Sequence, residues 1–440
     1  MRKAARPIFS QALQLVSRPS VVSGGAIWGN THLPLHQIQI AAAHSTTDVH
    51  RPLDHSSRSL RPWKYSSRDI AGYHNLASQE KDLDPFALVA DDLDVVTQRI
   101  RDYVINEVPI LSNAADYFFR AGVEGKRLRP TVLLLMASAL SVVVPPGEVA
   151  SAAFADNLRL RQQRIAEVTE MIHVASLLHD DVIDKATTRR GVGALNMVMG
   201  NKVAILAGDF LLARASIRLA NLHNTEVVEL LSTVIDHLVK GEVMQLTSSP
   251  ESLLSFEHYT EKTFYKTASL FAHSLKAVAI LGGHSAETVA HSYAYGNHLG
   301  LAFQLVDDVL DFTSSSGLLG KPALNDLQSG LATAPVLYAA EEFPALVPMI
   351  KRKFKNDGDV QQAELWVHKS QGIQRTRDLA RYHCELAAAS VHALPPAESE
   401  RQEECRRALL QLTDKVLAEA RDGVAVAMYA AQAFIMGGDS

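Results

Sequence analysis

Apolar residues recur at the three- and four-residue spacing of an amphipathic helix along most of the chain after Pro85. Alternating apolar and polar positions, which would indicate strands, are scarce, and glycine and proline lie mostly between the periodic stretches. The pattern therefore predicts an all-α protein. The clearest helical stretches are Phe86–Ile105, Pro130–Leu140, Ile165–Ile183, Val203–Leu222, Val227–Leu246, Thr267–Leu281, Thr288–Phe312 and Pro335–Ala340.

Composition divides the chain into segments. The helical pattern occupies 83–421, whereas 48–82 is rich in Ser, Arg, His and Asp without helical periodicity and is interpreted as a disordered linker. Within the helical part we expect an inserted loop at about 141–164, because Pro145, Pro146 and Gly147 interrupt the periodicity. Residues 422–440 form an atypical C-terminal extension that carries no candidate site residue.

The N-terminal segment 1–47 is basic, since Arg2, Lys3, Arg6 and Arg18 occur before the first acidic residue, Asp48. Serine, alanine and apolar residues fill the intervals, which is typical of an organelle-targeting peptide. We therefore predict a mitochondrial targeting peptide at 1–47 and a location in the matrix, with peripheral attachment to the inner membrane left open. A merely disordered N-terminus is the alternative.

The overall charge excludes some classes of function. The 440 residues carry a net charge of −5, which gives no support for a nucleic-acid-binding protein, because such proteins normally present a basic field. No apolar run approaches the roughly 18 residues that a membrane span needs. Two cysteines, Cys384 and Cys405, cannot build a disulfide framework, and this favours a reducing compartment.

An Asp-Asp-x-x-Asp motif at 180–184 carries the most specific chemical signal. Asp180 and Asp184 are four residues apart, so on a helix their carboxylates share one face. Two like charges at that spacing destabilise a helix, and a bridging divalent cation reverses the sign of the interaction. Hard oxygen ligands of this kind suit Mg²⁺, which keeps several waters and is usually completed by substrate phosphates.

The same motif recurs at 307–311, where Asp307 and Asp311 are again four apart in a strongly apolar helical stretch. A single motif is readily explained as a solvated surface. Two copies in apolar helices are not, because acidic side chains are almost never buried without a partner. We therefore predict two helices that face each other across a cavity and hold Mg²⁺ and a diphosphate between them.

Basic residues accompany both motifs. Any one of them is equally well explained as the partner of an acidic side chain, but together they supply positive charge for two diphosphates. Arginine binds phosphate oxygens in a bidentate fork, and lysine acts as a point charge. The candidates are Lys126, Arg129, Arg189, Arg190, Lys262, Lys266 and Lys321.

These motifs, in this order and at this spacing, resemble those of the trans-type polyprenyl diphosphate synthases. The resemblance runs from about 82 to about 420 and is closest to the mitochondrial long-chain members, which make hexaprenyl to decaprenyl chains for ubiquinone. The matched elements are Gly-Lys-x-x-Arg at Gly125, Glu-Met-Ile-His at Glu170, both acidic motifs, Arg-Arg-Gly at Arg189, Gly-Asp-Phe-Leu-Leu at Gly208, Gly-Glu-x-x-Gln at Gly241, Lys-Thr-Ala at Lys266, Gly-Lys-Pro at Gly320, and Asp326.

The resemblance implies an isoprenoid synthase bundle of about ten or more helices around a central apolar tunnel, as a homodimer or as a heteromer with a related subunit. It also implies an Mg²⁺-dependent prenyltransferase. Such an enzyme elongates an allylic diphosphate (farnesyl or geranylgeranyl) with successive isopentenyl diphosphate units to a long all-trans polyprenyl diphosphate. The ubiquinone side chain is the expected use of that product.

Roles for individual residues follow from the resemblance as well. The role of His173 depends entirely on the resemblance, because from the sequence alone a hydrogen-bonded histidine in the core explains this residue equally well. The implied metal ligands are Asp180, Asp184, Asp307, Asp308 and Asp311, and Asp181 is placed among the catalytic residues. The leaving diphosphate would be contacted by Arg189, Lys266 and Lys321, isopentenyl diphosphate by Lys126, Arg129, His173 and Arg190, and the developing allylic cation by Thr267 and Gln304.

Product length is expected to depend on Ala175 and Ser176, which precede Asp180 by five and four residues. At 1.5 Å per residue they lie roughly 5–7 Å below the metal site on the helix. In the family, bulky aromatic residues at these positions close the tunnel early. Both residues are small here, which predicts a long product, unless a bulky residue from another helix forms the floor.

Three other functions share some of these sequence features. A short-chain farnesyl or geranylgeranyl diphosphate synthase fits poorly with small residues at Ala175 and Ser176. A terpene cyclase usually replaces the second acidic motif, which this chain keeps at Asp307, Asp308 and Asp311. A subunit active only in a heteromeric synthase stays open, since intact motifs do not show that the chain works alone.

Overall fold

The computed structural model describes residues 83–104, 109–117, 127–144, 151–189, 192–313 and 324–422. All of them belong to one compact unit, Tyr65–Ser440. The expected targeting peptide at 1–47, the linker at 48–82 and nearly all of the C-terminal extension lie outside the described residues.

The first half of the described chain is helical apart from one short hairpin. Strands β1 and β2 pair antiparallel, with Thr188 opposite Gly193 and Arg189 opposite Val192. The elements are η3 (Ala87–Val89), α2 (Ala90–Val104), α3 (Pro109–Asp116), α4 (Leu128–Ala139), α5 (Ala152–Ile183), β1 (Thr188–Arg189), β2 (Val192–Gly193), α6 (Leu195–Val198), α7 (Asn201–Ala220), α8 (Thr225–Thr247) and η4 (Ser252–Leu254).

The second half continues as helices. A π-helical turn, η5, joins α9 to α10, so residues 256–281 form one helical run with a widened turn in it. The elements are α9 (Phe256–Thr263), η5 (Phe264–Ala268), α10 (Ser269–Leu281), α11 (Ala286–Thr313), α13 (Asn325–Gln328), α14 (Ala334–Glu342), α15 (Leu346–Lys351), α16 (Asp359–Lys369), α17 (Gly372–His392) and α18 (Glu400–Asp422).

The predicted all-α architecture is confirmed, and the predicted helical stretches match helices of the structure to within a few residues, except that α5 begins at Ala152 and not at Ile165. None of the described helices is both long enough and apolar enough to cross a bilayer. The two cysteines are free and buried.

The expected loop at 141–164 is wrong in its second half. Helix α5 already begins at Ala152, where the Ser151 side chain caps it by accepting a hydrogen bond from the Phe154 N–H. Such a cap satisfies one of the free amide groups at a helix start. Arg159 lies on this helix and forms an ion pair with Asp92 of α2.

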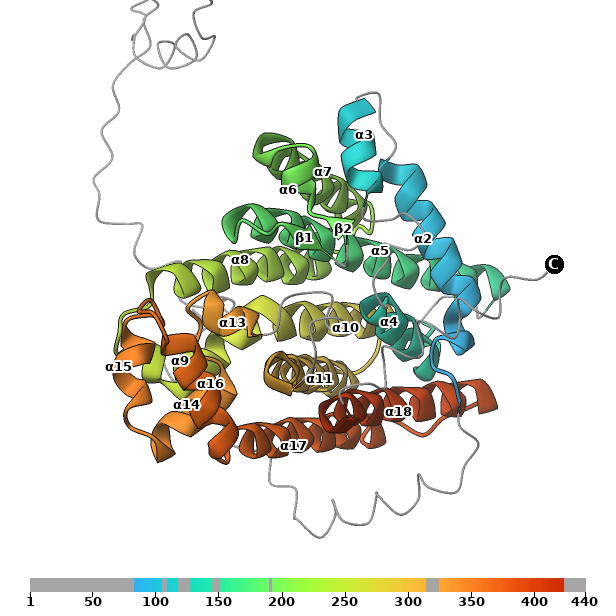
Figure 1. The fold of residues 1–440 in the computed structure, drawn as a ribbon. Helices are drawn as coiled ribbons and strands as arrows, with labels where there is room; N and C mark the ends of the chain where they lie inside the picture. The colour runs from blue at the N-terminus through green and yellow to red at the C-terminus, as the bar shows by residue number, and fades with distance from the viewer. Residues whose placement is uncertain are drawn as a thin grey trace, which may run out of the picture. The chain divides into compact units, whose positions relative to one another are not determined.

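Helices α10 and α11 lie at the centre of the bundle, with α5 and α8 on one side and α17 and α18 on the other (Figure 1). Two glycines of α11 allow this close approach. A Cβ on Gly296 would lie 2.7 Å from the Phe271 carbonyl oxygen, and a Cβ on Gly300 would lie 2.6 Å from the Cα of Ala268. The second acidic motif, about two to four turns further along α11, is thereby held next to η5.

Candidate active site

The first acidic motif forms the last turn of α5. Asp180 is half-buried and Asp184, at the end of the helix, is exposed. The pKa of Asp180 is raised to about 6, chiefly by burial. Lys266 opposes this rise, and the negative charges of Glu242 and Asp184 contribute to it. The pKa of Asp184 is raised for the same reasons, with burial the largest. These groups of α5, α8 and η5 therefore act on one another in one site.

Asp181 is turned away from Asp180 and Asp184. Its carboxylate is completely buried, and Arg189 on β1 donates to it through Nε, 3.0 Å from Oδ1 and 3.3 Å from Oδ2, and through Nη2. The Asn196 side-chain amide donates to the Asp181 carbonyl oxygen at 3.0 Å. Asp181 thus fixes Arg189 and the hairpin beside the end of α5, a placement that the motif alone does not reveal.

The second acidic motif lies on α11. Asp308 is buried, and it accepts hydrogen bonds from the Tyr259 hydroxyl at 2.5 Å and from the Gln304 side-chain amide at 3.0 Å. Burial raises the pKa of Asp308 to about 6, although both of these donors lower it. Asp311 is also buried, and its two oxygens accept from the backbone N–H groups of Asn325 and Asp326 at 3.2 Å each, at the start of α13. Asp307 is the most exposed of the three aspartates.

Turn η5 is bonded to α8 on one side and to α11, the second acidic helix, on the other. Lys266 donates to Glu242 Oε2 at 2.5 Å and to Gln245 Oε1 at 3.1 Å, both on α8. The next residue points to α11: Thr267 Oγ1 donates to Gln304 Oε1 at 3.0 Å, and Gln304 in turn donates to Asp308. A π turn widens a helix by one residue and often occurs at a functional site. Here it directs consecutive side chains toward different acidic clusters.

Close contact between α8 and η5 depends on Gly241. A Cβ at this position would lie 2.6 Å from Lys266 Cγ and 3.1 Å from Tyr265 Cβ. The Gly-Glu-x-x-Gln element thus lets η5 lie against α8, and it supplies both Glu242 and Gln245 as partners of Lys266. Sequence reasoning found this element but gave these two residues no role. The sequence signal for these roles was the glycine Gly241 followed by the polar residues Glu242 and Gln245.

Two of the residues expected at the isopentenyl diphosphate site come together between α4 and α5. Arg129 Nη1 lies 3.1 Å from His173 Nε2, and the Arg129 guanidinium lies over the Phe271 ring, 4.8 Å from its centroid. His173 is half-buried. Lys126, Arg190 and Lys321 lie outside the described residues, so the structure does not place them.

The carboxylates fit a divalent cation of the Mg²⁺ type. Among the described residues, no three His, Cys, Asp or Glu side chains are close enough to enclose an ion. Mg²⁺ does not need such a cage, because it is usually held by one or two carboxylates, waters and substrate phosphates. Glu242 Oε1 is buried without a hydrogen-bond partner beside Asp180 and Asp184. An added positive charge would therefore be stabilised in this cluster.

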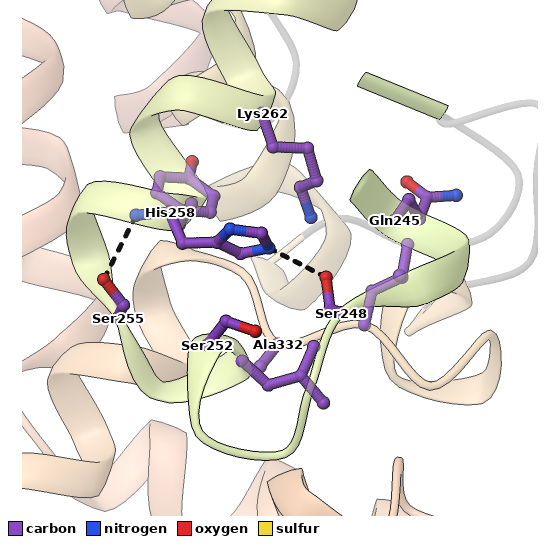
Figure 2. A pocket seen from close by; sticks show the side chains of 10 residues that line it. Gln245, Ser248, Ser252, Ser255, His258, Lys262 and Ala332 are labelled. Atoms are coloured by element: carbon purple, nitrogen blue, oxygen red, sulfur yellow. Dashed lines mark hydrogen bonds between the residues drawn. The ribbon is translucent and has the colours of Figure 1, made fainter. Parts of the chain in front are cut away.

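A pocket opens next to this cluster (Figure 2). The His258 ring lies across it and shares a 2.8 Å hydrogen bond between Nε2 and Ser248 Oγ. Lys262 extends into the same space from α9. The lining residues are Gln245, Ser248, Ser252, Leu253, Ser255, His258, Tyr259, Lys262, Leu331 and Ala332.

An all-α bundle that carries acidic motifs on two helices, with Arg189 and Lys266 held in ion pairs beside the first motif, fits a class of enzyme that acts on diphosphate esters. Comparison with known proteins gives the family. The sequence profile of the polyprenyl synthetase family matches residues 108–365. The chain is 52% identical over 364 residues to a mitochondrial solanesyl-diphosphate synthase 1 of Oryza sativa subsp. japonica, which covers 82% of this chain and 84% of that protein.

A second relative is a probable mitochondrial hexaprenyl pyrophosphate synthase of Yarrowia lipolytica, 40% identical over 390 residues, covering 76% of this chain and 84% of that protein. Among solved structures, a polyprenyl synthase of Caulobacter crescentus complexed with calcium and isoprenyl diphosphate matches with a TM-score of 0.65 and 31% identity. The match covers 76% of this chain and 96% of that one.

The chain belongs to the polyprenyl synthetase family. It is therefore a prenyltransferase that uses isoprenyl diphosphate substrates, and its relatives are long-chain all-trans polyprenyl diphosphate synthases. The predictions of family, enzyme class and mitochondrial location are confirmed.

The electrostatics of Asp180 predict the pH dependence of metal binding. A buried carboxylate with a pKa of about 6 is mostly ionised at pH 7.5 and half protonated at pH 6. The Mg²⁺ concentration for half-maximal activity should therefore rise about twofold by pH 6 and about tenfold by pH 5, since metal and proton compete for the carboxylate. Glu242→Gln removes a negative charge that raises this pKa, so it should move the acid limb of the profile to lower pH.

Activity measured against Mg²⁺ at each pH would test this prediction, with Glu257→Gln, on the first turn of α9, as the matched control. Protonation of the substrate affects all variants equally. An acid limb at the same pH in Glu242→Gln and wild type would contradict the assignment.

Proposed function

We propose that the protein condenses an allylic diphosphate (farnesyl or geranylgeranyl) with isopentenyl diphosphate, repeatedly and with Mg²⁺, to a long all-trans polyprenyl diphosphate for the ubiquinone side chain. The observation that carries the proposal is the arrangement around η5. Lys266 donates to Glu242 of α8, which interacts electrostatically with Asp180 of the first acidic motif. Thr267 donates to Gln304 of α11, which in turn donates to Asp308 of the second motif. A diphosphate with bound metal would lie between the two motifs.

The proposed chemistry starts with heterolysis of the allylic C–O bond. Mg²⁺, when bound to Asp180, Asp184 and Asp307, with Asp308 and Asp311 as further candidates, supplies Lewis-acid stabilisation of the leaving diphosphate. Arg189, Lys266 and Lys321 add fixed positive charge where negative charge develops. Thr267 and Gln304 present oxygen atoms near the allylic cation, and apolar surroundings exclude water from it.

Arg129 and His173, with Lys126 and Arg190, are proposed to hold isopentenyl diphosphate. The stacking of Arg129 on Phe271 supports this role, because it fixes the guanidinium plane while leaving its edge able to donate to phosphate oxygens. The double bond of isopentenyl diphosphate then attacks C1 of the allylic cation. The released diphosphate accepts the proton that is lost.

Incorporation of label tests the proposal. The full chain, with Mg²⁺, farnesyl diphosphate and labelled isopentenyl diphosphate, should give polyprenyl diphosphates well beyond four isoprene units. Asp180→Asn should lower the rate by about a hundredfold or more, since charge stabilisation in a transition state is commonly worth that much. Asp236→Asn, an exposed aspartate paired with Lys240 on α8, is the control.

The outcomes separate the alternatives. Products of fifteen or twenty carbons would identify a short-chain synthase. A folded protein that incorporates no label alone but does so with a related subunit would identify a member of a heteromeric synthase. A cyclic hydrocarbon would move the protein to the terpene cyclases.

Ala175 and Ser176 are proposed to permit a long product. Ala175 is completely buried, and the half-buried Ser176 donates from its hydroxyl to the His173 carbonyl oxygen at 2.8 Å. Ala175→Phe should shorten the product by several isoprene units, because the larger side chain would close the tunnel about one turn below the metal site. Chromatography of the dephosphorylated products would measure this.

Ser176→Phe adds the same ring one residue further along α5 and serves as the matched variant. Thermal unfolding would show whether either variant is folded. A folded Ala175→Phe enzyme that makes the wild-type distribution of products would show that another residue sets the length.

A homodimer through α7 and α8 is proposed over a heteromer. Both helices expose large apolar side chains: Leu206 is 56% exposed and Ile217 50%, on α7, and on α8 Val239 is 59%, Val243 50% and Leu246 58% exposed. The α8 residues follow the spacing of a single helix face. Contiguous exposed apolar surface of this kind marks an interaction site.

Val239→Asp should convert a dimer to monomers in light scattering, because each of two symmetry-related sites loses roughly 1.5 kcal/mol or more of apolar burial and gains a buried charge. Leu365→Asp, on α16, is the control because Leu365 is similarly exposed but lies on a different helix. A wild-type chain that is monomeric alone would contradict the homodimer and favour the heteromer.

A further inference from the structure

Lys262 is one of the candidate cations found in the sequence, but the family resemblance gives it no role and no particular substrate. It lies on the last turn of α9, four residues before Lys266, and lines the pocket beside the acidic cluster (Figure 2). Residues four apart on a helix lie about 5–6 Å apart at their Cβ atoms on the same face. Lys262 and Lys266 therefore extend along one side of the site.

The two lysines differ in their partners. Lys266 is neutralised by Glu242, at 2.5 Å, and is also held by Gln245. Within the described residues, Lys262 makes no ion pair or hydrogen bond, and its ammonium lies only near the face of the Tyr259 ring, 6.0 Å from the centroid. A half-buried ammonium is costly without a partner, so its positive charge is available to an anion that enters the pocket.

Charges on several elements act on this ammonium. Burial lowers the pKa of Lys262 most, Asp308 on α11 and Asp326 on α13 raise it, Lys266 lowers it, and Glu242 on α8 raises it. Lys262 is thus within electrostatic range of the second acidic motif and of Lys266. A metal-bound diphosphate would lie in the same place, because both acidic helices contribute to its binding.

We propose that Lys262 binds a phosphate group of the allylic diphosphate and keeps hold of the diphosphate after the C–O bond breaks. This assignment rests on the prenyltransferase function proposed above. Because Lys262 lies four residues from Lys266 on the same side of the helical run, it can contact the outer phosphate of a diphosphate held beside Lys266.

Lys262 transfers no proton in this step. The allylic C1–O bond breaks, its electron pair remains on the diphosphate oxygen, and the new C–C bond forms from the double bond of isopentenyl diphosphate. The proton lost from the new chain passes to the released diphosphate. Lys262 stabilises the negative charge on the leaving group throughout, so its effect concerns the allylic substrate and the diphosphate product rather than isopentenyl diphosphate.

The experiment compares Lys262→Gln, Lys262→Arg and wild type as full chains with Mg²⁺. Lys262→Gln should raise the KM for farnesyl diphosphate about tenfold to a hundredfold, the usual effect of losing a charge-assisted hydrogen bond. The inhibition constant of inorganic diphosphate should rise by a similar factor, and the KM for isopentenyl diphosphate should stay within about twofold. Lys262→Arg keeps the charge and should recover most of the binding.

Lys369→Gln, an exposed lysine on α16, is the matched control and should leave all three constants unchanged. Calorimetry of inorganic diphosphate with Mg²⁺, on wild type and Lys262→Gln, tests the binding role separately from turnover. If wild type bound diphosphate through Lys262 but incorporated no isopentenyl unit, the proposed function would fail and the binding site would stand.

Two results would overturn the proposal. One is a folded Lys262→Gln protein with unchanged diphosphate affinity and unchanged KM for farnesyl diphosphate. The other is an equal rise in KM for both substrates, since that would indicate a general change in the field of the site rather than contact with one ligand.

Discussion

The structure depends on holding two groups of carboxylates close together without letting their repulsion open the bundle. Asp180 and Asp308 both have a pKa raised to about 6, chiefly because they are buried. Turn η5 lies between them, and its Lys266 and Thr267 are bonded to opposite sides. These bonds fix η5 between α8 and α11 before any ligand arrives, and they position Glu242 beside Asp180. Such preorganisation is what charge stabilisation in catalysis requires.

Small residues make these bonds possible. Gly241 brings α8 to Lys266, and Gly300 brings α11 to Ala268, the last residue of η5, because any Cβ at either position would lie about 2.6 Å from a neighbouring atom. The charged site and the apolar core are therefore parts of one packing arrangement. A change that moved α10 away from α11 would also separate Thr267 from Gln304, even though it altered no polar group.

Sequence patterns predicted the helices and the acidic motifs because both rest on local spacing. Asp180 and Asp184 share a face through the helix period alone, whereas the burial of Asp181 against Arg189 depends on a hairpin that follows the helix. The start of α5 was missed because Pro145, Pro146 and Gly147 suggested a long loop, whereas the Ser151 cap starts the helix a few residues after them. The contacts of Glu242, Tyr259 and Lys262 could not be predicted, because each meets its neighbours only after α8, α9 and α11 have packed.

The different partners of Lys266 and Lys262 affect how metal and diphosphate bind in the site. Lys266 is already neutralised by Glu242, so on its own it adds little net attraction for a diphosphate. The carboxylates, in turn, favour protons or metal over any free anion. Net positive charge for the leaving group must therefore come from the metal together with cations that have no carboxylate partner, and Lys262 is such a cation among the described residues. Metal and diphosphate should consequently bind interdependently, since each compensates the charge that the other leaves unbalanced.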